Sequence, residues 1–135
     1  MNISNDGWFD GTSEHEEHLA ICRFRAVECR RSVVRAVNMG VSAVIDGNGR
    51  VLRPELVRCD GDNCIWQVAG DHPGPLPVSD WSQFKKVAGV LIATVPIDSR
   101  SSLYARWGDW LPIGCWIVVG AGVAIGLLWP KRIPE

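Results

Sequence analysis

Two histidines, His15 and His18, lie three residues apart in a stretch with helical periodicity, with Glu16 and Glu17 between them. Histidines on one helix face can bind a metal ion together. The zinc-protease motif, however, needs its two histidines four residues apart. We therefore interpret the stretch as a solvated, acidic first turn of a helix, and we predict no metal site and no cofactor.

A nucleophile for covalent catalysis is also hard to assign. The sequence has no Gly-x-Ser-x-Gly elbow, and its only lysines are Lys85, Lys86 and Lys131. Cys29 comes at the end of a predicted helix, where the helix dipole disfavours a thiolate. The residues alone therefore predict no catalytic site.

The remaining polar residues allow more than one interpretation. Arg35 and Asn38 lie at the end of an apolar stretch, where they could reach a pocket or satisfy buried backbone groups. Cys59 and Cys64 have no second cysteine pair near them, so they do not form a metal-ligand motif. Fourteen Lys and Arg against fifteen Asp and Glu give a net charge of −1, which does not favour nucleic acid as a partner.

The element that would carry the two histidines is a helix that begins after Ser13 and runs to about Arg31. Ser13 and Glu16 fit a capping box, in which each side chain binds a backbone amide of the other. Apolar residues recur at helical spacing at Leu19, Ala20, Phe24 and Val27. Residues 4–11, rich in Asn, Asp and Gly around two aromatics, predict a structured loop before the helix.

Strands follow the helix. The β-branched stretches 33–37 and 41–45 predict two strands, and Asp46-Gly47-Asn48-Gly49 predicts a tight turn that pairs 41–46 with 50–52. Residues 53–86 contain four prolines and are expected to be mostly irregular. The nearly continuous apolar run 87–95 is typical of a buried strand. These elements predict an α+β fold.

The stretch 111–129 has 19 residues and no charge. At about 1.5 Å per residue, a helix of that length nearly crosses a bilayer core of roughly 30 Å. Trp110, Trp116 and Trp129 suit the membrane interfaces. The stretch therefore predicts a transmembrane helix rather than a buried core helix, with membrane lipid as its partner.

Three glycines in this stretch, Gly114, Gly122 and Gly126, follow a four-residue spacing. Small residues at this spacing allow a second helix to pack closely. Because glycines are numerous in this stretch, the spacing can also arise by chance, and the alternative is a membrane anchor with no partner helix.

Several segments together resemble one family. They are Ser-Asn-Asp-Gly-Trp-Phe at 4–9, Arg-Ala-Val-Glu at 25–28, the run 34–46, Gly-Arg-Val at 49–51 and the aromatic stretch 104–110. In this order they resemble the C-terminal part of apolipoprotein N-acyltransferase, a membrane-embedded member of the nitrilase (carbon-nitrogen hydrolase) superfamily.

The resemblance implies a fold and a location. Residues 1–98 would be the C-terminal portion of a nitrilase-like αββα sandwich, with the excursion 53–86 inserted in it. An interfacial connector would follow at 99–110, then the single membrane helix and a tail at 130–135. The family implies the cytoplasmic (inner) membrane with the domain on its outer face. The charges around the helix do not decide its orientation in the membrane, because Arg100 and Arg106 before it are matched by Lys131 and Arg132 after it.

The resemblance also implies an activity. The family moves an acyl chain from a phospholipid to the N-terminal diacylglyceryl-cysteine of a lipoprotein, through a thioester on a Cys supported by Glu and Lys. Those three residues precede the Asn-Asp-x-Trp loop in the family, and the chain has no counterpart of them. We therefore expect a fragment or split subunit that is inactive without the N-terminal part of the enzyme.

The resemblance also assigns residues of this chain to the family's substrate pocket. Asn5, Asp6, Trp8 and Phe9 match the loop that borders the acyl pocket, and Arg35 and Asn38 match the strand behind it. The excursion 53–86 is longer than the family's usual link. The family's oxidising compartment, together with the closeness of Cys59 and Cys64, suggests a disulfide between them. A non-catalytic, membrane-anchored binding module that uses the Trp8–Phe9 loop and the excursion is the alternative function.

Overall fold

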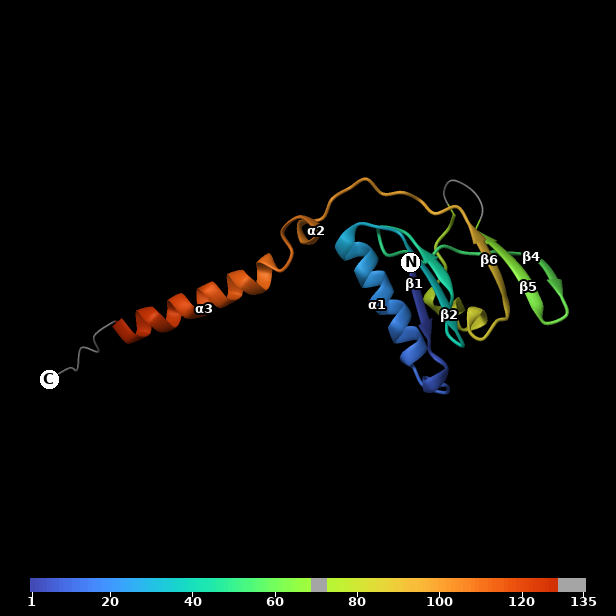
Figure 1. Cartoon of the computed structure of the whole chain (residues 1–135), viewed down its shortest axis with the longest axis horizontal. Coiled ribbons are helices and arrows are strands. Elements are labelled where there is room, and N and C mark those ends of the chain that lie inside the picture. Colours follow the sequence, from blue (N-terminus) through green and yellow to red (C-terminus); the bar gives the residue numbers. More distant parts are fainter. Residues whose placement is uncertain (69–72, 129–135) are drawn as a thin grey trace. The chain divides into compact units, whose positions relative to one another are not determined.

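The computed structural model describes residues 1–68 and 73–128, apart from the side chain of Phe9. The chain divides into two units, Met1–Ser102 and Leu103–Glu135. The first unit contains six strands and the second contains the apolar helix, among the residues described (Figure 1). We describe each unit by itself.

The first sheet has three strands in the order β1 (Asn2–Asn5), β2 (Val33–Asn38) and β3 (Ala43–Ile45). β1 and β2 are parallel, and β2 and β3 are antiparallel. Parallel strands need a crossover connection, and the helix α1 (Glu14–Cys29) provides it between β1 and β2. The helix packs on one face of the sheet (Figure 1). The predicted loop at 4–11 is therefore wrong at its start, where β1 is a strand.

The N-terminus of α1 differs from the predicted capping box. Ser13 makes no capping hydrogen bond and instead donates from Oγ to the Glu17 carboxylate, 3.0 Å away. The Glu14 amide donates to Thr12 Oγ1, and Glu16 forms an ion pair with Lys85 at 3.0 Å. The capping box prediction is wrong because Glu16 has this partner across the fold.

The predicted hairpin after β2 is confirmed. Asp46 O accepts a hydrogen bond from Gly49 N, and Leu52 N donates to Val44 O, each at 2.9 Å. Gly49 has φ +77°, which L side chains rarely adopt, so the turn needs glycine there. The second arm pairs through the single bridge between Ile45 and Val51 rather than as a long strand.

The segment 53–86 is not mostly irregular, and that prediction is wrong. It contains β4 (Glu55–Asp60), β5 (Asn63–Val68) and the 3₁₀ helix η2 (Val78–Phe84). With β6 (Gly89–Ala93), the strands form a second sheet in the order β4-β5-β6. The Trp66 and Phe84 rings pack edge to face with centroids 5.0 Å apart, which ties β5 to η2.

Cys59 and Cys64 lie directly opposite each other on β4 and β5 and form a disulfide, with Cα atoms 4.1 Å apart. The bridge closes a hairpin whose first strand is exposed along its whole length. It constrains the unfolded chain over a sequence separation of 5 residues.

Reducing this disulfide is expected to lower the free energy of unfolding by about 2 kcal/mol, the amount that chain entropy gives for so short a loop. The measurement is the urea midpoint of the full chain in detergent, with and without a thiol reductant. A Cys59→Ser/Cys64→Ser variant is the control, since a reductant should leave its midpoint unchanged. Equal midpoints for the oxidised and reduced chain would contradict the expectation.

Two apolar clusters hold the first unit together, and the alternation of side chains along β3 separates them. Ala43 and Ile45 face α1, where they pack with Leu19, Cys22, Ala26, Val41, Val51, Leu76 and Trp81. Val44 faces the other way and packs with Leu52, Val68, Leu91 and Ala93, so the second sheet lies against the first. The described part of this unit is thus α1 on one face of the first sheet and the second sheet on the other.

The strand predicted at 87–95 is present as β6, but it is not buried. Leu91 and Ala93 face the first sheet, whereas Val90 and Ile92 on the outer face are 59% and 52% exposed. The apolar run predicted a strand buried on both faces, but in the described part of the chain only one face of β6 is covered.

The second unit contains α2 (Leu103–Trp107) and α3 (Trp110–Leu128). Helix α3 has 19 residues, and an 18-residue window in it has a mean hydropathy of 2.2, so it is long and apolar enough to cross a membrane. A Cβ at Gly114, Gly122 or Gly126 would meet nothing within 4 Å, so the predicted packing surface is open in this chain. Trp129 and the predicted tail 130–135, with Lys131 and Arg132, lie outside the described residues.

Candidate functional site

The loop after β1 is tied to the end of β2. Asn38 Nδ2 and Gly7 N both donate to Asn5 Oδ1, at 3.1 and 3.2 Å, and Asp6 N donates to Asn38 O at 3.1 Å. Because β1 and β2 are parallel and Asn5 pairs with Asn38, their carboxyl ends meet at this edge of the sheet. The short 3₁₀ helix η1 (Gly7–Phe9) begins there.

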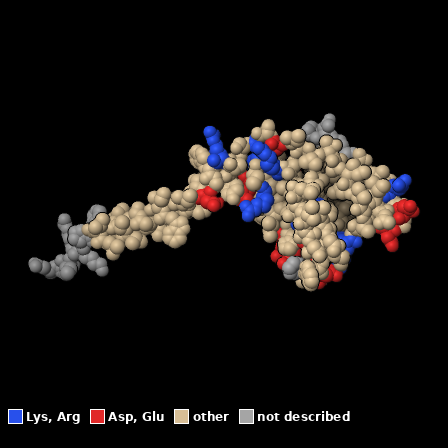
Figure 2. Space-filling model, viewed as in Figure 1, with Lys and Arg blue, Asp and Glu red and all other residues tan. Residues whose placement is uncertain are grey.

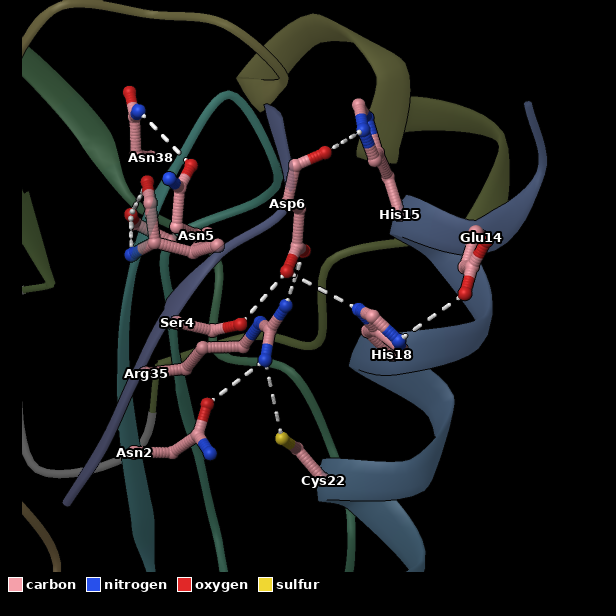
Figure 3. Close-up of polar contacts among 12 residues, drawn as sticks. Asn2, Ser4, Asn5, Asp6, Glu14, His15, His18, Cys22, Arg35 and Asn38 are labelled. Atoms are coloured by element: carbon pink, nitrogen blue, oxygen red, sulfur yellow. Dashed lines mark hydrogen bonds and ion pairs between the residues drawn. The ribbon is translucent and has the colours of Figure 1, made fainter. Parts of the chain in front are cut away.

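Asp6 lies at the centre of the site, between β1 and α1 (Figure 3). Its residue surface is 0% exposed. Oδ2 accepts a hydrogen bond from the Arg35 guanidinium at 2.5 Å, and Oδ1 accepts one from Ser4 Oγ at 2.8 Å. His18 Nδ1 lies 3.1 Å from the same Oδ1, so the buried carboxylate has partners from two strands and the helix.

Arg35 satisfies buried side chains. Its guanidinium also donates to Asn2 Oδ1 at 2.8 Å and to Cys22 Sγ at 3.5 Å, and the residue is 3% exposed. The sequence left open a pocket role or a role in satisfying buried backbone. The structure shows an ion pair with Asp6, which a buried charge requires, and it also places Arg35 among the residues that line the groove between the two sheets.

His15 and His18 turn inward, so the predicted solvated first turn is wrong. His15 is 0% exposed, and its Nε2 lies 2.9 Å from the Asp6 carbonyl oxygen. His18 lies between two carboxylates, with Nε2 3.7 Å from Glu14. Among the described residues no group of three or more His, Cys, Asp and Glu side chains could hold a metal ion.

The partners of Asp6 determine its protonation. Burial raises the pKa of the Asp6 carboxyl, but hydrogen bonds from Ser4 and His18 and the charge of Arg35 outweigh burial and hold this pKa below 3.8. The carboxylate is therefore ionised at neutral pH, with its oxygens engaged. Such a group fixes the position of its neighbours and is poorly placed to take a proton from a substrate.

Acid is expected to unfold the first unit in a defined window. The pKa of Asp6 and that of Glu16 lie below their ordinary values, and Arg100 lowers the pKa of Asp98 to about 2. A lowered carboxyl pKa contributes stability that is full above the unfolded value and is lost as the pH falls through the folded value. The urea midpoint should therefore stay level from pH 7 to about 5 and fall below about pH 4. A midpoint that does not change between pH 5 and 3 would contradict this.

The loop presents an aromatic side chain to the outside. Trp8 is 85% exposed, two residues after the fully buried Asp6. The Asp6 cluster, which we define as Ser4, Asp6, His15, His18 and Arg35, thus fixes the backbone from which Trp8 projects. The side chain of Phe9 lies outside the described residues.

A groove of about 250 Å³ opens between the two sheets. Val34, Ala36 and Val44 line one side, and Leu91 and Trp66 line the other. The sequence could not predict this groove, because it depends on the second sheet. Its walls are mostly apolar.

The structure brings together four of the predicted pocket residues, Asn5, Asp6, Arg35 and Asn38. It does not bring Cys59 and Cys64 to them, because these lie in the β4–β5 hairpin. Gly114, Gly122 and Gly126 belong to the second unit. The sequence did not predict Ser4 as a partner of Asp6 or Cys22 as a partner of Arg35. It drew attention to His15 and His18 only as a metal motif with the wrong spacing. The alternation of Asn2, Ser4 and Asp6 could have predicted a shared strand face.

No family model matches the chain. Three curated relatives carry the same name, apolipoprotein N-acyltransferase. The protein from Caulobacter vibrioides is 34% identical over 113 residues, which is 78% of this chain and 21% of the relative. The Vibrio cholerae protein is 32% identical over 132 residues, 98% of this chain and 20% of the relative. The Verminephrobacter eiseniae protein is 49% identical over 51 residues, 38% of this chain and 10% of the relative.

The fold and the site define an α+β domain joined to an apolar helix of membrane-spanning length. The similarity identifies the chain as homologous to part of apolipoprotein N-acyltransferase, as the sequence predicted. It spans about a fifth of the length of the Caulobacter vibrioides and Vibrio cholerae relatives.

Proposed function

We propose that the chain is one part of a phospholipid-to-apolipoprotein N-acyltransferase. In this proposal the complete enzyme transfers an acyl chain from a phospholipid to the amino group of a lipoprotein's diacylglyceryl-cysteine. The observation that carries the proposal is the coverage, since 98% of the chain aligns with 20% of the Vibrio cholerae relative. The first unit would be a partial nitrilase-like αββα sandwich, an assignment that α1 and the two sheets support.

The proposed role of this part is to build one wall of the substrate pocket. By resemblance, the loop that carries Asn5, Asp6, Trp8 and Phe9 borders the acyl pocket, and Arg35 and Asn38 lie on the strand behind it. The Asp6 cluster supports this role because it fixes the backbone just before Trp8. A fixed wall lowers the entropy lost when a flexible acyl chain is positioned.

The chain alone is proposed to be inactive. The resemblance assigns catalysis to a Cys supported by Glu and Lys that precede the loop, and these residues have no counterpart in the chain. Apolar surface on the first sheet supports the need for a further part: Ile3 is 72% exposed, beside the exposed Ala36 on the face turned away from α1. The remainder of the enzyme would cover the part of this face that the second sheet leaves exposed.

In the assembled enzyme α3 would cross the cytoplasmic membrane, with the first unit on its outer face. The mean hydropathy of α3 supports the crossing. The open surface around Gly114, Gly122 and Gly126 would then pack against a membrane helix of the remaining part. Phospholipid and lipoprotein are the proposed substrates.

A binding module without catalysis is the second candidate. The observation that favours it is the disulfide-closed hairpin, in which all six residues of β4 are exposed. Such a hairpin could bind a protein without any help from an active site.

Co-purification separates the two candidates. The chain would be co-expressed with the portion of the Vibrio cholerae relative that it does not match, and the membrane complex would be isolated in detergent. We expect a stable complex that Ile3→Asp weakens at least tenfold, because Ile3 lies on the face to be covered. Val57→Asp, on the exposed β4 strand, is the matched control and should leave recovery unchanged. Loss of the complex with Val57→Asp but not with Ile3→Asp would favour the binding module.

A further inference from the structure

The segment 96–102, which leads to the second unit, is bound to one end of α1. Arg31 donates to the carbonyl oxygens of Asp98 and Arg100, both at 2.8 Å. Ser32 Oγ donates to Pro96 O, and Ser102 Oγ donates to Glu28 O in the last turn of α1. This irregular segment is therefore fixed to the first unit up to its last residue.

This attachment limits the distance between the end of α1 and the apolar helix. Seven residues, 103–109, separate Ser102 from Trp110, where α3 begins. Even fully extended, this linker spans about 28 Å. If α3 crosses the membrane, as proposed above, the end of α1 lies near the bilayer surface through chain connectivity alone.

Three arginines, which we call the arginine cluster, lie at this end: Arg30, Arg31 and Arg100. The hydrogen bonds that Arg30 and Arg31 make go to neutral acceptors, namely Asn48 Oδ1 and backbone carbonyls. Arg100 binds both Asn48 and the Asp98 carboxylate, and its side chain is 55% exposed. The positive charges of Arg30 and Arg31 are thus stabilised in place without a carboxylate hydrogen bond.

The opposite end of α1 has the opposite charge. Its first turn contains Glu14, Glu16 and Glu17. Figure 2 shows acidic side chains around the start of α1, and basic side chains with acidic ones beside them around its end.

We propose that the arginine cluster binds the phosphate groups of anionic phospholipids at the bilayer surface. Guanidinium groups form strong, charge-assisted hydrogen bonds with phosphate. Each basic residue near an anionic membrane contributes enough to shift the bound population about fivefold.

Hydrogen exchange of the full chain in lipid nanodiscs tests the inference. One set of discs contains phosphatidylcholine alone, and a second set contains phosphatidylglycerol as well. We expect the amides of 28–32 and 97–102 to exchange up to about fivefold more slowly in the anionic discs than in the phosphatidylcholine discs. High salt should remove the difference, since the Debye length falls to about 3 Å at 1 M.

Three variants separate lipid binding from a structural role. Arg30→Gln should lose the lipid-dependent protection, and Arg30→Lys should keep most of it. Arg58→Gln, on the distant β4 strand, removes the same charge and should behave as the unchanged chain. Equal exchange in both lipids, or equal loss with Arg30→Gln and Arg58→Gln, would overturn the proposal and leave the cluster to an acidic protein surface. Failure of α3 to protect its own amides in either disc would instead refute the membrane anchor on which the proposal rests.

Discussion

Asp6→Asn is expected to lower the free energy of unfolding by about 3 to 5 kcal/mol, the cost of leaving a buried arginine without its counter-charge. The Arg35 side chain is 2% exposed and cannot reach water without opening the contact between α1 and the first sheet. An amide keeps the shape of the carboxylate but removes its charge. Urea unfolding of the full chain in detergent measures the effect.

Glu28→Gln is the matched control for this change. Glu28 also pairs with an arginine, at 2.6 Å, but the Arg25 side chain is 63% exposed. Exposed pairs contribute roughly 0 to 1 kcal/mol, so this variant should unfold nearly as the unchanged chain does. Similar effects of the two substitutions would show that the Asp6–Arg35 pair is not buried as described.

Leu19→Ala is expected to lower stability by about 2 to 5 kcal/mol. Leu19 is 0% exposed and lies in the apolar cluster between α1 and the first sheet. Truncation removes apolar contacts and leaves a cavity that the flanking strands cannot close. The measurement is the same urea midpoint.

Ile21→Ala, two residues along the same helix, provides the comparison. Ile21 is 55% exposed on the outer side of α1, so its truncation should change the midpoint little. A larger loss for Ile21 than for Leu19 would mean that α1 presents a different face to the sheet.

The helical spacing predicted α1, but it selected the wrong inward face. Leu19 is buried, whereas Phe24 and Val27 are 75% and 38% exposed. The residues that do face the sheet include the small side chains Cys22 and Ala26, which let the helix approach closely. Apolar residues occur on both sides of α1, so periodicity alone could not decide between them.

The Asp6 cluster shows which part of a site is readable from sequence. The resemblance pointed to Asp6 and Arg35, and the structure brings these two into contact. The inward turn of His15 and His18 could not be predicted, because it depends on a buried carboxylate from another element. Side chains that come together from three separate elements leave no local pattern in the sequence.

The second sheet was missed for a similar reason. β4 and β5 are short, with polar and apolar residues mixed, and their pairing is closed by a disulfide rather than by a buried face. Prolines at 54, 73, 75 and 77 suggested irregular backbone, yet all four lie outside the strands. The prolines correctly indicated where regular structure breaks, but the strands between them were not predicted.

Acyl transfer measured directly tests the central claim that this chain is one part of an N-acyltransferase. The purified chain, with and without the portion of the Vibrio cholerae relative that it does not match, would be given phospholipid and a diacylated lipopeptide. Mass spectrometry would follow the addition of a third acyl chain. We predict no product from the chain alone and product from the reconstituted pair. Turnover by the chain alone would contradict the claim.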